Sequence, residues 1–431
     1  MLTGLHSHRN GVPVFNRFDA SLPTFVHALH DAGYFTGLFG KWHLGSIPQG
    51  FDRWRILPGQ GDYVDSAFEG PDGRRKLPGY VTDVITDLSL AFLDERPADR
   101  PFLLLCHHKA PHRPWDPPPS TESRRSDPAI PEPATLRDDY ATRTDAAREA
   151  AMTIARHLRN RDLKIPPPPG ATDAERRRHA DQIPESVTIT DERGPRLISG
   201  DELLIWKYRR YLGDYLACVD SLDRNVGRLL DRLDRDGLAR DTLVIYASDN
   251  GFFLGEHGWY DKRFMYEESI RIPFLMRWPA AVPAGRTSDA MVLNLDLAQT
   301  ITDVAGAAAP PGAQGRSLRP LFDGPTPADW RSSFYYRYYH DPGDHDVRAH
   351  YGVRTRTHKL VRFPTKSQTE LYDLVADSLE LRNVYDDPAF KAVRTELEAE
   401  LAKAKSEAGD DDRFAGTKLP YGADLPASRP R

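Results

Sequence analysis

A short apolar run that leads into two oxygen-bearing side chains constrains this chain more than any other feature. Residues 242–246 read Thr-Leu-Val-Ile-Tyr, a composition typical of a buried strand. Asp249, Asn250 and Gly251 follow soon afterwards. In open α/β sheets, ligands bind beyond the carboxyl ends of the strands. A carboxylate and an amide oxygen there suit a hard divalent cation such as calcium, although an Asx turn that closes the strand explains the pair equally simply.

The residues behind this pair favour a functional site over a plain turn. The segment Gly255-Glu-His-Gly258 comes next, and Lys262 follows it. An ordinary turn gives no reason to hold a histidine and a lysine so close behind an acidic side chain. We therefore interpret Asp249 and Asn250 as candidate metal ligands.

A second predicted strand, residues 34–39, opens onto Lys41 and His43. A lysine and a histidine two positions apart point the same way only if the backbone stays extended. Because a lone Lys-x-His is also common on protein surfaces, the motif by itself does not separate a site from a solvated loop.

A third predicted strand, residues 101–106, leads into several histidines. His107, His108 and His112 follow it within a few positions, and imidazole is a common metal ligand. We favour a proton-transfer role for His112. His107 and His108 are equally consistent with the core and with a supporting position beside the site.

Taken together, these motifs resemble the type I sulfatases of the alkaline phosphatase superfamily. Four segments carry the resemblance in the family's order: Leu2-Thr-Gly-Leu-His-Ser-His-Arg-Asn-Gly-Val12, Gly40-Lys-Trp-His-Leu-Gly45, Lys109-Ala-Pro-His-Arg-Pro114, and Ser248 through Pro279. The resemblance implies an α/β fold with a mostly parallel central sheet flanked by helices. It also implies a smaller C-terminal domain with an antiparallel sheet and a helix.

The resemblance further implies a hydrolase of sulfate monoesters, with a carbohydrate ester as the expected substrate. Catalytic roles then fall on Lys41, His43, His112 and Lys262. The two lysines neutralise the sulfate oxygens, and His112 contacts the ester and acts as general acid for the leaving oxygen. In the family, the histidine that matches His43 helps to collapse the sulfated intermediate.

The resemblance also implies two cofactors. Asp249 and Asn250 would help to hold a divalent cation, expected to be Ca²⁺, while His257 and His108 would support the site from behind. The second is formylglycine, which the family makes from the cysteine or serine of a Cys- or Ser-x-Pro-x-Arg motif. That motif and an aspartate pair lie upstream of the segment that matches residues 2–12.

The precursor of formylglycine is absent from this sequence. Cys106 and Cys218 lack the proline and arginine of the motif, so we interpret both as structural. We therefore expect an N-terminal truncation and a chain that is inactive as given. Two alternatives stay open, namely a phosphodiesterase or phosphonate monoester hydrolase of the same superfamily, and a non-catalytic relative that binds anionic sugars or a partner.

The hydrophobic pattern divides the chain into three parts. Residues 1–327 are expected to form the α/β domain, with an irregular, proline-punctuated insertion at about 116–200 that contains a helix or two. Residues 328–408 contain short alternating runs and a helical stretch, as in a small α+β domain. Residues 409–431 are expected to form a disordered tail.

Composition excludes several other classes of protein. The formal net charge of −5 gives no sign of a general nucleic-acid binder, and two cysteines cannot build a disulfide framework. No run of 18 apolar residues is present, so no membrane span is expected. The first residues do not have the pattern of a signal peptide, and the sequence assigns neither a compartment nor an oligomeric state.

Overall fold

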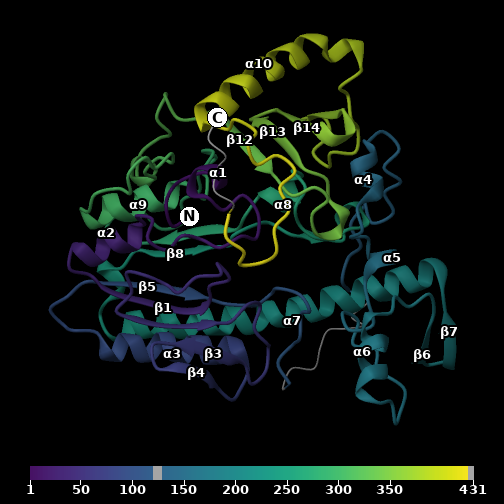
Figure 1. Ribbon diagram of the computed structural model, residues 1–431, viewed down its shortest axis with the longest axis horizontal. Coiled ribbons are helices and arrows are strands. Elements are labelled where there is room, and N and C mark those ends of the chain that lie inside the picture. Colours follow the sequence, from purple (N-terminus) through teal and green to yellow (C-terminus); the bar gives the residue numbers. More distant parts are fainter. Residues whose placement is uncertain (120–128, 426–431) are drawn as a thin grey trace.

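A five-stranded sheet lies at the centre of the N-terminal part of the structure, a computed structural model that describes residues 1–119 and 129–425 (Figure 1). Its strand order is β4-β3-β2-β1-β5. The strands are β1 Phe35–Lys41, β2 Arg53–Leu57, β3 Ala67–Gly70, β4 Gly73–Lys76 and β5 Phe102–His107. The strands β2, β1 and β5 run parallel, whereas β3 and β4 pair antiparallel at one edge. The expected α/β class with a parallel central sheet is thereby confirmed.

The central strand β1 is buried along almost its whole length, as its apolar sequence predicts. It aligns with β5 so that Gly40 lies opposite His107. A side chain at Gly40 would place its Cβ 2.0 Å from the His107 carbonyl oxygen, and Gly40 has a φ of 110°. Only glycine therefore lets the carboxyl ends of these two strands approach so closely.

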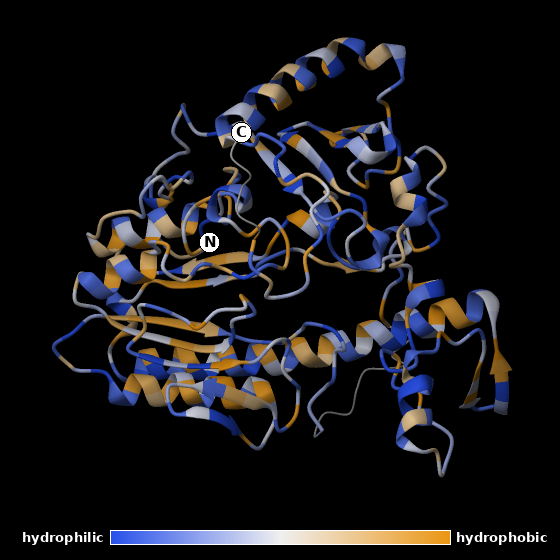
Figure 2. Ribbon diagram, in the orientation of Figure 1, coloured by the Kyte–Doolittle hydropathy of each residue, from blue (hydrophilic) through white to orange (hydrophobic). Residues whose placement is uncertain are grey.

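Helices cover the sheet. On one face, α3 Val81–Glu95 packs against β1, β5 and the long helix α7 Gly200–Arg235 (Figure 1). Three ion pairs join the exposed edges of these two helices: Arg224–Asp83, Arg228–Asp87 and Arg232–Asp94. Elsewhere, α2 Phe25–Asp31 packs on β1 and on α9 Asp296–Ala305. Figure 2 shows hydrophobic ribbon concentrated in the central strands that these helices cover.

A two-stranded sheet carries the predicted metal ligands. It consists of β8 Val244–Ala247 and β11 Phe274–Arg277, which pair antiparallel. The short helix α8 Glu267–Ile270 precedes β11, and β9 Phe253–Leu254 pairs with β10 Tyr260–Asp261. The residues between β8 and β11 therefore return to the sheet edge where β8 ends.

The C-terminal domain is an antiparallel sheet covered by one helix, as expected. Its strands are β12 Ser333–Tyr338, β13 His350–Thr355, β14 His358–Phe363 and β15 Gln368–Asp373, in that order, and the helix is α10 Lys391–Ala408. The fully buried Lys359 joins this domain to the first, because its Nζ lies 2.6 Å from Glu380 and 2.9 Å from Glu267.

The insertion contains a β-hairpin in addition to the helices that its sequence predicts. Its described part contains α4 Asp145–Glu149, α5 Ile154–His157, α6 Asp173–Asp181, β6 Val187–Asp191 and β7 Gly194–Ile198. In Figure 1, α6 and the β6–β7 hairpin lie beside the N-terminal end of α7. Residues 120–128 of the predicted insertion lie outside the described residues.

The segment after Gly409 differs from the disordered tail that its sequence predicts. Residues 410–425 run back across the N-terminal part of the molecule, where Gly422 N donates to Phe15 O at 2.8 Å (Figure 1). Residues 426–431 lie outside the described residues. Within the described ranges, no helix combines the length and the apolar character needed to cross a bilayer.

Candidate active site

Lys41 and His43 lie where β1 ends. Lys41 is the last residue of the strand, and its carbonyl oxygen accepts a hydrogen bond from His107 Nδ1 at 3.2 Å. His43 has a left-handed backbone with a φ of 48°, which is uncommon for a residue other than glycine. The chain therefore turns at His43, so a turn, rather than the extended backbone that the Lys-x-His spacing requires, sets the direction of its side chain.

His112 lies in the loop after β5 and is held on both sides. Its carbonyl oxygen accepts a hydrogen bond of 2.6 Å from the Tyr63 hydroxyl. Its Nδ1 lies 2.8 Å from Arg113 O, and because a carbonyl only accepts, Nδ1 carries the proton. Nε2 is then the nitrogen that can exchange a proton with a ligand. Arg113 is anchored in turn by the buried Asp162, at 2.7 and 2.5 Å.

Lys109 is a neighbour whose role the sequence did not reveal. It is 3% exposed, its Nζ donates to Gln60 O at 3.0 Å, and it lies over the Tyr63 ring. Burial lowers its pKa to about 8. The only sequence signal was its place at the start of the Lys-Ala-Pro-His motif.

The charges of these side chains act on one another, which places them in one cluster. Burial, then the positive charges of Lys262 and Lys109, lowers the pKa of Lys41 to about 8. Burial and the charges of Lys41 and Lys262 also lower the pKa values of both histidines. The values are about 4 for His43 and about 3 for His112. We refer to these five residues as the lysine–histidine cluster.

Lys262 reaches the cluster from a strained turn. Its neighbours Asp261 and Arg263 have φ values of 75° and 105°. An ion pair of 2.7 Å joins these two neighbours, and Ser269 Oγ accepts a hydrogen bond from Arg263 N at 2.9 Å. Two non-glycine residues with positive φ persist only where such contacts hold them, so the position of Lys262 is tightly determined.

Asp249 and Asn250 lie beyond the end of β8, and Asp249 is exposed. The negative charge of Asp249 opposes the lowering of the pKa values of Lys41 and His43. Asp249 therefore faces the same cluster. Asn250 Nδ2 donates to Gly251 O at 2.6 Å, which leaves its amide oxygen for another partner. These oxygens suit Ca²⁺, which takes six to eight oxygen ligands. Two residues supply only part of such a ligand set, and residues 1–119 and 129–425 contain no group of three His, Cys, Asp or Glu suited to a metal.

The structure does not place the two predicted supporting histidines in the cluster. His257 is fully buried, its Nδ1 lies 2.9 Å from Asp138 Oδ2, and its ring packs against Tyr266. His108 Nε2 lies 3.3 Å from Cys106 Sγ, behind the end of β5. His257 therefore packs in the core and His108 is half-buried, and their supporting role stays a prediction.

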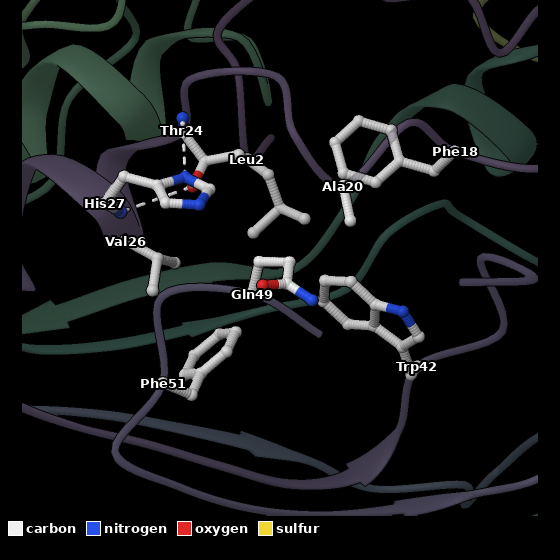
Figure 3. A pocket seen from close by; sticks show the side chains of 9 residues that line it. All are labelled: Leu2, Phe18, Ala20, Thr24, Val26, His27, Trp42, Gln49 and Phe51. Atoms are coloured by element: carbon white, nitrogen blue, oxygen red, sulfur yellow. Dashed lines mark hydrogen bonds between the residues drawn. The ribbon is translucent and has the colours of Figure 1, made fainter. Parts of the chain in front are cut away.

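A small hollow beside this region is not a second candidate. Leu2, Trp42 and Phe51 line it from three segments of the chain, and Thr24 and His27 are hydrogen-bonded to each other at its edge (Figure 3). Its lining contains no lysine, arginine or carboxylate. The hollow therefore lacks the lysines that the lysine–histidine cluster offers to an anionic ester.

Comparison with known protein families assigns the chain to a family. The sulfatase family matches residues 1–307, and the C-terminal domain of N-sulphoglucosamine sulphohydrolase matches residues 255–407. The chain belongs to the sulfatase family. Its relatives are sulfuric ester hydrolases, and sulfatases typically use a divalent cation and formylglycine.

The chain is also similar in sequence to individual sulfatases. The chain is 42% identical to the N-acetylglucosamine-6-O-sulfatase of Bacteroides thetaiotaomicron, over 96% of this chain and 77% of that protein. It is 24% identical to an ulvan-active sulfatase of Formosa agariphila, over 88% of this chain and 65% of that protein. It is 27% identical to the human N-acetylglucosamine-6-sulfatase, and the match spans 71% of this chain and about half, 49%, of that protein.

Solved structures support the sulfatase fold. One, a complex with its substrate D-glucosamine-2-N,6-O-disulfate, matches with a TM-score of 0.86 and 39% identity over 95% of this chain and 87% of that chain. A phosphonate monoester hydrolase of Agrobacterium radiobacter matches with a TM-score of 0.68 and 20% identity, over 94% and 85% of the two chains, which shows a shared fold alone.

The sulfatase nucleophile does not fit either cysteine of this chain. Burial raises the pKa of Cys106 and of Cys218 to about 11, so neither thiol ionises readily. Cys218 is fully buried on α7 and within 3.4 Å of Asp116 O. Both cysteines therefore pack as structural residues.

Proposed function

We propose that this sulfatase hydrolyses the 6-O-sulfate ester of N-acetylglucosamine or of a closely related glucosamine. The observation that carries the proposal is the electrostatic coupling of Lys41 and Lys262 to His112, whose pKa is lowered by burial and then by these two charges. The 42% identity to an N-acetylglucosamine-6-O-sulfatase supports the sugar and the position of the ester. The structural likeness to a protein bound to D-glucosamine-2-N,6-O-disulfate supports the same choice.

Lys41 and Lys262 would bind the sulfate group. Their ammonium groups are compact point charges that suit its non-bridging oxygens. Both approach from rigid positions, one at the end of β1 and the other in the strained turn after β10. Held in place before the ester arrives, they stabilise negative charge that develops during the reaction without having to reorganise.

His112 would protonate the leaving alcohol. With a pKa of about 3, the imidazole is neutral at pH 7 before the ester binds. Two causes of this low pKa are the charges of Lys41 and Lys262, which a bound sulfate ester neutralises. Binding therefore raises the pKa of His112, and its Nε2 gains the proton that the leaving oxygen needs.

His43 would accept a proton in a later step of the reaction. Its pKa of about 4 keeps it neutral and able to accept a proton at pH 7. Asp249 and Asn250 would contribute oxygen ligands to a divalent cation, most consistent with Ca²⁺, which polarises the sulfate oxygens when bound. Formylglycine would supply the nucleophile of the family, and neither Cys106 nor Cys218 has the motif from which it is made.

The test is a substrate comparison with the full-length product of the reading frame. N-acetylglucosamine 6-sulfate, glucosamine 2-N-sulfate, 4-nitrophenyl phosphate and a phenylphosphonate monoester would be supplied separately, with release of sulfate or phosphate measured by ion chromatography. We expect the largest kcat/KM for the 6-sulfate. Faster hydrolysis of the phosphorus esters would favour a phosphodiesterase or phosphonate hydrolase, and binding of the sugar without turnover would favour a non-catalytic relative.

A further inference from the structure

The C-terminal segment, defined here as residues 413–425, is tied to Phe15 and Arg17 near the N-terminus. Two backbone hydrogen bonds join them: Gly422 N donates to Phe15 O at 2.8 Å, and Arg17 N donates to Ala423 O at 2.7 Å. The Arg17 side chain adds an ion pair of 3.3 Å with Asp424. These contacts join residues about 400 positions apart in the sequence, so they fix the C-terminal segment against the N-terminal residues.

The approach is close enough to require glycine at one position. Gly45, two residues beyond His43, has a φ of 68°. A Cβ at Gly45 would lie 2.9 Å from Gly422 Cα, nearer than real side chains allow. The turn that ends the Lys-Trp-His motif thus also forms the surface on which the C-terminal segment lies.

Tyr421 is the residue that this docking brings onto the lysine–histidine cluster. Its ring stacks on the His43 imidazole, with centroids 4.4 Å apart and planes inclined by 18°. Tyr421 remains 47% exposed, so it covers His43 without being buried itself. A surface tyrosine whose one close ring contact is a candidate proton acceptor is not explained by core packing.

His43 needs such a contact. Its backbone is in the left-handed region, and among the described residues no hydrogen-bond partner is found for its imidazole. An imidazole without a hydrogen bond can rotate about its side-chain torsions, which would carry its nitrogens away from the reacting group. A stacked aromatic ring restricts that rotation and covers one face of the imidazole.

We infer that Tyr421 is a positioning residue for this reaction, which holds the His43 imidazole in its working orientation through the docked C-terminal segment. The inference rests on the role of His43 in the proposed function. Stacking of this kind contributes enough to predict a loss of roughly three- to tenfold in kcat for Tyr421→Ala. KM should change by less than about twofold, since the lysines that bind sulfate keep their places.

Conservative variants separate positioning from general stability. Tyr421→Phe keeps the stacked ring and should retain kcat, whereas Tyr421→Leu keeps bulk without a ring plane and should behave like Tyr421→Ala. The matched control is Tyr385→Ala, which removes a half-buried tyrosine whose hydroxyl bonds to Glu398 in the C-terminal domain. That control should leave kcat and KM unchanged.

A second measurement follows His43 without relying on turnover. Diethyl pyrocarbonate modifies neutral imidazole, and mass spectrometry of the peptide that contains His43 gives the rate at that residue. We expect several-fold faster modification of His43 in Tyr421→Ala than in the unchanged protein, Tyr421→Phe or Tyr385→Ala. Equal rates in all four proteins would show that the ring does not cover His43 and would overturn the inference.

A His43→Ala variant separates this inference from the proposed function. If His43→Ala loses turnover while Tyr421→Ala keeps normal kcat, the positioning role is refuted and the proposed function stands. If His43→Ala turns over normally, the proposed role of His43 is refuted, and the positioning role falls with it. If turnover falls in both His43→Ala and Tyr421→Ala but is retained in Tyr421→Phe, the proposed function and the positioning role are both supported.

Discussion

Replacing Asp162 with alanine should destabilise the protein through the loop that carries His112. The Asp162 carboxylate has 0% exposed surface and accepts three hydrogen bonds, two from Arg113 at 2.7 and 2.5 Å and one from Arg159 N at 2.9 Å. Alanine would leave the Arg113 guanidinium, only 20% exposed, without its counter-charge.

The size of the effect follows from this burial. Removal of one partner from a buried ion pair costs about 3–5 kcal/mol, because the remaining charge stays desolvated. Since Arg113 keeps some contact with water, we expect the lower end, about 3 kcal/mol in the free energy of unfolding. Because Arg113 follows His112 directly, kcat should fall as well.

Urea unfolding of the full-length protein, followed by tryptophan fluorescence, measures this free energy. The matched control is Glu95→Ala, which breaks the Arg53–Glu95 pair of 2.9 Å, whose side chains are 53% and 56% exposed. That exposed pair should contribute less than about 1 kcal/mol. Equal losses in Asp162→Ala and Glu95→Ala would refute the reasoning, since burial would then not determine the energy.

Three further outcomes are expected. Because bound sulfate should raise the pKa of His112 from about 3, calorimetry should show tighter binding of inorganic sulfate at pH 5 than at pH 7, and a persisting pH dependence in His112→Gln would contradict this. Burial lowers the pKa of His350 to about 4, so this histidine takes up a proton on unfolding; thermal stability should fall from pH 6.5 towards 4, and less steeply in His350→Phe. Asp249→Ala should weaken Ca²⁺ binding in calorimetry while Asp223→Ala, an exposed change on α7, should not; equal affinities would exclude Asp249 as a ligand.

Much of the fold was predictable because buried strands have a local signature. The apolar, β-branched run at residues 242–246 identified β8, which pairs with β11. Their antiparallel pairing was not predictable, since composition does not give strand direction. The strand β4 was missed because all four residues, Gly-Arg-Arg-Lys, are exposed and show no alternation.

The site was predictable where its residues belong to strand ends, and less so where tertiary contacts decide. Lys41 and His112 follow apolar runs, so their shared edge could be inferred from the sequence. The ring of His257 turns into the core because its backbone has a φ of 55° and Asp138 hydrogen-bonds to it, and neither fact is visible in the motif. Tyr421 lies in a polar segment, and only its distant contacts bring it to the site.

The most direct test of the account is how the His112→Ala variant of the full-length protein depends on the leaving group. A sugar 6-sulfate releases a poor leaving group that needs a proton, whereas 4-nitrophenyl sulfate releases a stable phenolate that does not. We predict that His112→Ala lowers kcat/KM on N-acetylglucosamine 6-sulfate by about a hundredfold or more, the usual scale for a general acid, and lowers it far less on 4-nitrophenyl sulfate. An equal loss on both substrates would contradict the assignment of His112 as the general acid.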